Sequence, residues 1–275
     1  MTIPSFDNEI VEGLRVKPRI QMLEIRDRER PVGKPIAWLL VERQETYRRD
    51  TPDGQVYEAI IRLSYELITP RYTHHQAGKG DFVGRYSMLD NSVSLSSATS
   101  FAGAVFLDLN GFEGQRIGTY LMNEIVMWVQ RWPDADVNSV ALLSGQGADD
   151  NRERRNRFWE QFGLEFDYSD LVRQAGHSRA MLVKELTPTE AWKQNITERR
   201  MQDYLADVLY AEQRAVSELD RLTNALHRRV AEIKKAEDKP IRWVLKTLYF
   251  KYGGIMVGGS VLAVFATALW WNLRG

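Results

Sequence analysis

The part of the sequence best suited to chemistry is residues 104–132, AVFLDLNGFEGQRIGTYLMNEIVMWVQRW. The pattern predicts a strand at Ala104–Leu109, a glycine-bearing turn at Asn110–Gly118 and then an amphipathic helix. Such a turn directs several backbone N–H groups toward one point, at the positive end of the helix dipole. An anion, above all a phosphate or pyrophosphate, is the natural ligand there, so the sequence predicts a phosphorylated cofactor.

Two common phosphate-binding motifs do not occur at this turn. No Gly-Lys-Ser/Thr follows the loop, as the Walker motif requires. The paired glycines of a dinucleotide fingerprint are missing as well, and the turn does not open a βαβ series. The sequence therefore gives little support to nucleotide hydrolysis or hydride transfer.

The window Glu113–Gly118, EGQRIG, followed by TYLM, resembles the acetyl-CoA turn of the GNAT-type N-acetyltransferase superfamily. In that family the pattern Gln/Arg-x-x-Gly-x-Gly/Ala holds the pyrophosphate through backbone amides. Glu113 replaces the usual first residue, Arg116 replaces the first glycine and Gly118 matches the second. A second block, Asn151–Phe166, resembles the family's later signature, an Asn-containing helix ending in Phe-Tyr-Glu-Lys-Leu-Gly-Phe.

The resemblance implies that acetyl-CoA is bound as the acyl donor, without a metal. Gly114 is expected to compensate for the lost first glycine, and Arg116 to add a cationic contact to the phosphates. The implied cofactor-binding residues are Leu107, Leu109, Gly114, Gln115, Arg116, Ile117, Gly118, Thr119, Asn151, Asn156 and Trp159.

For catalysis the resemblance implies direct attack of an amine on the thioester. Backbone N–H groups at a split between adjacent strands, around Leu107–Leu109, would polarise the carbonyl. The tyrosine that protonates the departing thiolate falls at Trp159, which has no acidic proton, so Tyr168 is the candidate substitute; Tyr120 is the other nearby phenol. Asp108 is the candidate general base, with a solvated or turn-capping aspartate as the alternative.

Two functions follow from these features. The first is an N-acetyltransferase, tethered to a membrane, whose amine acceptor is a small molecule, a protein N-terminus or a lysine side chain. The second is a catalytically inactive acetyl-CoA-binding or scaffold module that oligomerises at the membrane, motivated by the departures at Glu113, Arg116 and Trp159.

Composition limits the partners. Of the 275 residues, 37 are Lys or Arg and 37 are Asp or Glu, so no net charge points to nucleic acid. The chain has no cysteine, which rules out a disulfide framework and thiolate chemistry. The N-terminus lacks the basic and apolar regions of a signal peptide.

The elements that must position the turn are mostly strands. Expected strands are Ile20–Ile25, Ala37–Tyr47, Val56–Ile68, Asn138–Ser144, Leu164–Tyr168 and Ser178–Leu186, and a second helix is expected at Asn151–Phe162. The expected fold class is α+β. The resemblance implies a GNAT-like mixed, mostly antiparallel sheet flanked by helices, over residues 1–186.

A long helix is expected next, over residues 187–239. Thr187-Pro188-Thr189-Glu190 has the composition of a capping box, and no Gly or Pro follows before Glu237. Apolar residues recur with a period close to 3.5, so self-association is expected through residues 190–235. The alternative is a helix packed on its own domain.

The last segment, residues 240–275, is expected to contain a transmembrane helix. No charged residue occurs from Tyr252 to Leu273, and Gly254 and Gly258 have the spacing of a helix-packing motif. More basic residues precede this stretch than follow it, which predicts a single-pass anchor with the N-terminal domain in the cytoplasm. The alternative is a buried helix of a soluble domain.

Overall fold

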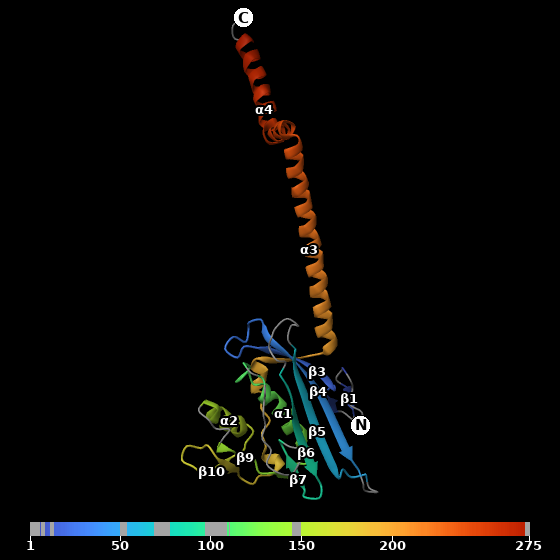
Figure 1. Cartoon of the computed structure of the whole chain (residues 1–275), viewed down its shortest axis with the longest axis vertical. Coiled ribbons are helices and arrows are strands. Elements are labelled where there is room, and N and C mark those ends of the chain that lie inside the picture. Colours follow the sequence, from blue (N-terminus) through green and yellow to red (C-terminus); the bar gives the residue numbers. More distant parts are fainter. Residues whose placement is uncertain are drawn as a thin grey trace. The chain divides into compact units, whose positions relative to one another are not determined.

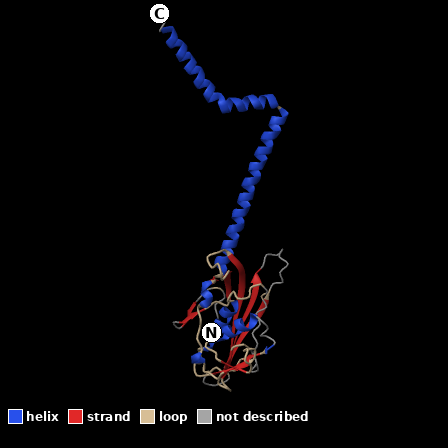
Figure 2. Cartoon of the chain, turned by 90° about the vertical axis from the view of Figure 1, so that its left-hand side faces the viewer, coloured by secondary structure: helices blue, strands red, loops and turns tan. Residues whose placement is uncertain are grey.

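The structure is a computed structural model of the whole chain. It describes residues 6, 9–11, 14–49, 54–68, 78–96, 109, 111–144 and 150–272. Among these, only the backbone is described for residues 9–11, 14–16, 150, 253–262, 268, 269, 271 and 272. The chain divides into two units, Met1–Ala206 and Asp207–Gly275. The described strands all lie in the first unit, and the second is helical (Figure 2).

A seven-stranded, mostly antiparallel sheet forms the first unit and makes the fold α+β (Figure 1). Its order is β12-β3-β4-β5-β6-β7-β8, and only the β7–β8 pair is parallel. The strands are β3 (Ile20–Arg26), β4 (Pro35–Arg48), β5 (Glu58–Ile68), β6 (Lys79–Ser87), β7 (Ser92–Ser94), β8 (Asp136–Val137) and β12 (Ile196–Arg199). A separate hairpin joins β1 (Glu9–Val11) to β2 (Leu14–Val16). The strands expected near residues 20–25, 37–47 and 56–68 are confirmed.

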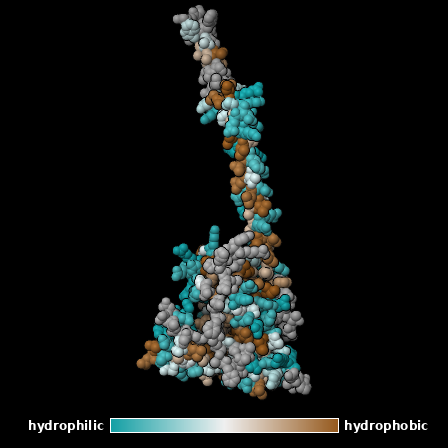
Figure 3. All heavy atoms as spheres, in the orientation of Figure 1, coloured by the Kyte–Doolittle hydropathy of each residue, from teal (hydrophilic) through white to brown (hydrophobic). Residues whose placement is uncertain are grey.

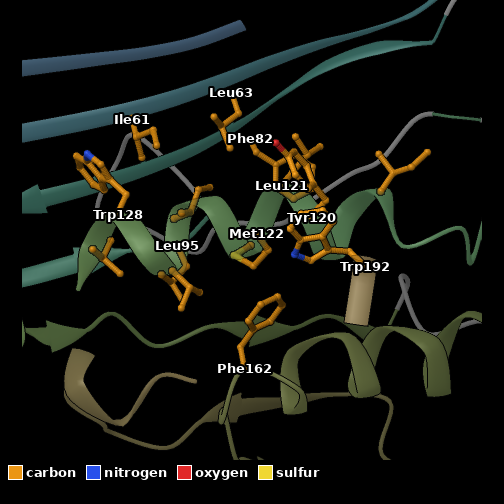
Figure 4. Close-up of a cluster of buried hydrophobic side chains, with 14 of the residues drawn as sticks. Ile61, Leu63, Phe82, Leu95, Tyr120, Leu121, Met122, Trp128, Phe162 and Trp192 are labelled. Atoms are coloured by element: carbon orange, nitrogen blue, oxygen red, sulfur yellow. The ribbon is translucent and has the colours of Figure 1, made fainter. Parts of the chain in front are cut away.

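The helix α1 (Ile117–Val129) packs on one face of this sheet, as the sequence predicts. Side chains of β5 alternate between buried and more exposed, because successive residues of a strand point to opposite faces. Figure 4 shows Ile61, Leu63 and Phe82 on one side of α1 and Phe162 on the other. Eleven of the thirteen residues of α1 are buried, so the helix lies inside the protein.

A second, three-stranded sheet lies on the same side of the large sheet as α1, together with α2 (Asp150–Glu160) (Figure 1). Its order is β10-β11-β9, with β9 at Ala141–Leu142, β10 at Phe166–Tyr168 and β11 at Gly176–Ser178. The parallel strands β7 and β8 pair over two residues, and the chain then crosses to the small sheet, where β9 pairs with β11. The large sheet therefore forks beyond Val93 and Val137.

The strand expected at Ser178–Leu186 is wrong. Only its first residue belongs to a strand, β11, and a 3₁₀ turn, η2 (Val183–Glu185), follows. Val183 and Leu186 are 0% and 3% exposed, and these three-residue-spaced apolar side chains enter the core from a turn. Burial of these side chains, with an isolated antiparallel β-bridge between Leu182 and Asp136 in place of a full strand, satisfies this apolar stretch.

The helix expected from Thr187 is also wrong, because α3 begins at Met201. The residues between form a 3₁₀ helix, η3 (Ala191–Gln194), and then β12, which pairs with β3. Trp192 and Ile196 are 5% and 2% exposed. Their burial against the sheet and α1 overrides the local helix signal, as tertiary context commonly does.

The second unit consists of most of α3 (Met201–Asp238) and of α4 (Pro240–Asn272). The long helix is thus confirmed, though it starts later than expected. Proline cannot donate the helix hydrogen bond at its own position, and α4 begins at Pro240, the first-turn position where proline is tolerated.

The transmembrane helix expected at residues 252–273 is corrected. Within the described part of the chain, no helix is both long enough and apolar enough to cross a membrane. The first half of α4 carries Arg242, Lys246 and Lys251, and its described side chains beyond residue 252 are those of residues 263–267 and 270. The single-pass membrane localisation and its orientation are corrected with it. Gly254 and Gly258 lie where only the backbone is described.

Candidate functional site

The turn that leads into α1 has an unusual backbone. Gly111 and Gly114 have positive φ angles of 86° and 78°, and Arg116, which precedes the first helical residue, has φ 62° and ψ 14°. This left-handed conformation is common for glycine and costly for other residues. No side chain caps the N-terminus of α1, so the first-turn N–H groups are not used by a capping residue.

Asn195 anchors this turn and was not predicted as a functional residue. Its side chain is 3% exposed, and its Nδ2 lies 3.0 Å from the carbonyl oxygens of both Arg26 and Gln115. Its Oδ1 accepts a hydrogen bond from Arg116 Nη1 at 3.1 Å. A second tie joins Gln115 Oε1 to the backbone N–H of Arg28 at 2.9 Å. The turn is therefore fixed by residues far from it in sequence.

Two arginine side chains, Arg28 and Arg116, interact at this turn. Burial, together with the like charge of Arg28, lowers the pKa of Arg116. Among the described residues, no carboxylate forms an ion pair with Arg116. The nearby Glu113 carboxylate instead accepts a hydrogen bond from the backbone N–H of Gly111 at 2.9 Å. Two guanidinium groups and a helix N-terminus thus act together on the same region.

The other predicted residues of the turn that the structure describes are buried or half-buried. Leu109 and Ile117 are 2% and 1% exposed and belong to the core. Gly118 lies next to Phe158 of α2, because a Cβ added there would be 3.5 Å from that ring. The Thr119 hydroxyl accepts a hydrogen bond from Gln161 at 3.2 Å. Leu107 and the candidate base Asp108 lie outside the described residues.

The predicted residues of α2 have other contacts. Asn151 Oδ1 accepts a hydrogen bond from Arg154 at 2.8 Å. Asn156 is buried and donates to the carbonyl oxygen of Arg173 at 3.1 Å, fixing the loop before β11. Trp159 is 4% exposed and packs edge-to-face on Phe158 in the core. None of these described contacts reaches the turn before α1.

Tyr168, the candidate acid, lies on β10, and its hydroxyl donates to Glu160 Oε1 at 3.3 Å. Burial raises the pKa of Tyr168, and the negative charge of Glu160 raises it further. The phenol therefore keeps its proton at neutral pH. Tyr168 also contacts the ring of Phe166, and the guanidinium of Arg173 lies 5.4 Å from its ring centre; none of these described contacts includes the turn.

Sequence reasoning missed a buried ionic cluster on the sheet-facing side of α1. The Glu124 side chain is 2% exposed and lies 2.6 Å from Lys17 Nζ and 2.8 Å from Arg43 Nη1. Arg43 also pairs with Glu45 at 2.7 Å. Four residues before Glu124, the fully buried Tyr120 hydroxyl lies 2.7 Å from Gln21 Oε1 and 2.8 Å from Glu198 Oε1, so this phenol belongs to the core.

A signal for this cluster exists in the sequence. On β4 the core-facing residues change from Ala37, Leu39 and Val41 to Arg43 and Glu45 without a change of period. An apolar alternation that continues into charged residues indicates that the same face stays buried and needs an ionic partner.

Comparisons with known proteins give little. No protein-family model matches the sequence, and no curated protein matches it significantly. One solved structure, a domain from Methanocaldococcus jannaschii DSM 2661, is similar with a TM-score of 0.27 and 8% sequence identity, over 51% of this chain and 100% of that domain. A likeness of this degree indicates neither a fold family nor a function.

Proposed function

We propose that this protein binds acetyl-CoA at the turn before α1 and transfers the acetyl group to an amine. The conformation of Arg116 is the observation that carries the proposal. This residue stands at the first glycine of the GNAT pattern, and it has the left-handed φ of 62° that a glycine adopts readily. The backbone thus keeps the glycine conformation where the side chain departs from the pattern.

The charges at the turn suit a pyrophosphate. N–H groups of the first turn of α1 point out of the helix end, and the side chains of Arg28 and Arg116 add two cations beside them. Guanidinium groups form bidentate hydrogen bonds with phosphate oxygens, and a bound dianion would relieve the repulsion between the two arginines.

The fork in the large sheet also supports the proposal. The GNAT resemblance implies a split between adjacent strands around Leu107–Leu109, whose N–H groups polarise the thioester carbonyl. Here β7 and β8 are parallel, pair over two residues and then separate. The strand expected to lead into the turn, residues 104–109, falls mostly outside the described residues.

The proposed reaction is a direct transfer. The amine nitrogen, after losing a proton, attacks the carbonyl carbon of the thioester; the C–N bond forms, the C–S bond breaks and the thiolate of CoA leaves with a proton. Asp108 as base and Tyr168 as acid stay predictions. The raised pKa keeps the proton on Tyr168 but makes the phenol a weaker acid, and its hydrogen bond to Glu160 would have to exchange for one to the thiolate.

Calorimetric titration of the full chain with acetyl-CoA tests the proposal. We expect saturable binding that weakens by roughly tenfold for each guanidinium removed in Arg28→Gln and Arg116→Gln. Arg62→Gln is the matched control, because this half-exposed arginine pairs with Asp81 on the sheet face opposite α1. Failure of the wild-type chain to bind at millimolar acetyl-CoA would refute the proposal.

A second candidate function is an acetyl-CoA-binding module without catalysis. Trp159 favours it, because this residue stands at the family's acid position, has no acidic proton and is fixed in the core. Release of CoA thiol, measured across a panel of small amines, peptides with free N-termini and lysine peptides, separates the two. Binding with no thiol release from any acceptor would favour the module.

A further inference from the structure

The helix α3 exposes a long apolar stripe. None of its 38 residues, all of them described, is buried. Leu205, Leu219, Leu222, Leu226 and Ile233 are between 47% and 64% exposed. Figure 3 shows apolar side chains recurring along α3 between hydrophilic ones. A helix of this length, roughly 57 Å, needs a partner to cover such a stripe.

The spacing of the stripe indicates that the partner is another helix. Positions 205, 212, 219, 226 and 233 follow one another in steps of seven and hold Leu, Glu, Leu, Leu and Ile. Val208, Val216, Leu222 and Val230 flank them three or four residues away. A heptad repeat sustained over four steps is the pattern of helices that pack side by side with interlocking side chains.

The charges of α3 are divided between its two halves. Residues 203–220 contain five acids and one base, whereas residues 221–235 contain five bases and one acid; Glu237 and Asp238 end the helix. The helix dipole favours acids at the start and bases at the end, but its effect is confined to the first and last turns. The division extends over the whole length, so the dipole does not account for it.

From this charge division we infer that α3 pairs with α3 of a second copy of this chain in antiparallel orientation. Antiparallel pairing places the acidic half of each helix against the basic half of the other, whereas parallel pairing places like charges together. The two copies are then related by a two-fold axis, and the same surface serves both partners.

One register aligns the stripes of the two helices. With Leu219 at the two-fold axis, Leu205 faces Ile233 of the second copy, and Val216 faces Leu222. The same register sets Val208 opposite Val230. Leucine, isoleucine and valine therefore meet one another along the length of the pair.

The same register accounts for Glu212 and Arg229, the two charged residues that interrupt the apolar stripe. Glu212 lies opposite Leu226, less than one turn from Arg229 of the second copy, so the long side chains of Glu212 and Arg229 can pair across the interface. Among the described residues of one chain, Arg229 forms an ion pair with Glu232 alone, at 3.2 Å, and the Arg229 side chain is 80% exposed. A surface pair of this kind is weak and can exchange for another.

Cross-linking of the full chain tests the orientation, since the natural sequence has no cysteine. We expect a short bismaleimide to join Leu205→Cys to Ile233→Cys when two differently tagged variants are mixed, with little product from either variant alone. Homodimers from each variant alone would show a parallel pair, and no product in any mixture would show that α3 does not self-associate. Either result would overturn the inference.

Charge reversal gives an independent test by sedimentation equilibrium of the full chain. Glu212→Arg should raise the dissociation constant by roughly tenfold or more, and Glu212→Arg with Arg229→Glu should restore it. Arg214→Glu, two residues from Glu212 and on the opposite side of the helix, is the matched control and should leave association unchanged. Failure of the double variant to restore association would contradict the antiparallel register. Helix content by circular dichroism checks that all variants fold.

Discussion

The left-handed backbone at Arg116 can be tested by replacing this residue with glycine and, separately, with alanine. Both substitutions remove the guanidinium and its 3.1 Å hydrogen bond to Asn195, so these losses cancel when the two variants are compared. What differs is the Cβ atom at a φ of 62°. This left-handed conformation is unfavourable for a residue with a Cβ atom but not for glycine. We therefore expect Arg116→Gly to be more stable than Arg116→Ala by about 1 kcal/mol.

Urea unfolding of the full chain, followed by tryptophan fluorescence, measures this difference. The same pair of substitutions at Met127, a 38% exposed position within α1, is the control. There the order should reverse, with alanine more stable than glycine by about 1 kcal/mol, because glycine is a poor residue inside a helix. An alanine variant at position 116 as stable as the glycine variant would refute the left-handed turn and remove the main support for the acetyl-CoA site.

Three further predictions concern the polar groups around α1. Glu124→Gln should destabilise the full chain by about 3 kcal/mol in urea unfolding, because the half-buried Lys17 and the largely buried Arg43 lose a carboxylate while each keeps a second one. Burial alone would raise the pKa of Glu45, but Arg43, Tyr47 and Arg131 outweigh it and the pKa is lowered from 4.5. The contribution of Glu45 is therefore present above that value and lost as the pH falls through its folded pKa, so between about pH 6 and about pH 3 the wild type should lose more stability than Glu45→Gln. Asn195→Ala should cost about 2 kcal/mol, since it leaves the carbonyl oxygens of Arg26 and Gln115 without their donor.

Matched controls separate these effects from general damage. Glu66→Gln, at an exposed position of β5, should change the unfolding free energy by less than about 0.5 kcal/mol. A Glu124→Gln variant within that range would contradict the buried ionic cluster. Equal acid sensitivity of wild type and Glu45→Gln would contradict the lowered pKa. For Asn195, an Asp replacement that restores stability would show that the side-chain acceptor matters more than the donor.

The strands and helices with a clear period were predictable. The alternation of apolar and polar residues in β4 and β5 and the helical period of α1 arise because each element buries one face. Burial of one face appears in the sequence as a regular spacing of apolar residues. The region after residue 178 was not predictable, because Trp192 and Ile196 are buried by contacts with distant segments. Their burial turned a capping-box sequence into a 3₁₀ helix and an edge strand.

At the candidate site, the turn before α1 was predictable from the sequence, but the side chain that anchors it, Asn195, was not. Gly114 marks a turn before a helix, because glycine at positive φ is a local requirement at position 114. Asn195 supports the turn from 80 residues away, so no local pattern identifies it. The membrane expectation rested on the absence of charge over residues 252–273, and no helix of the described part of the chain is both long enough and apolar enough to cross a membrane.

The pairing of β12 with β3 also sets an order of events during synthesis. Ile25 pairs with Ile196, so at 5–20 residues per second roughly 10–30 seconds separate the two on the ribosome. Throughout that interval β3 presents one free edge, and a free edge is a template for pairing with the wrong chain. A nascent chain released at residue 186 would keep the seven-residue edge of β3, whereas in a chain that reaches residue 206 the edge strand is the four-residue β12, and a short edge is a poorer template for wrong pairing.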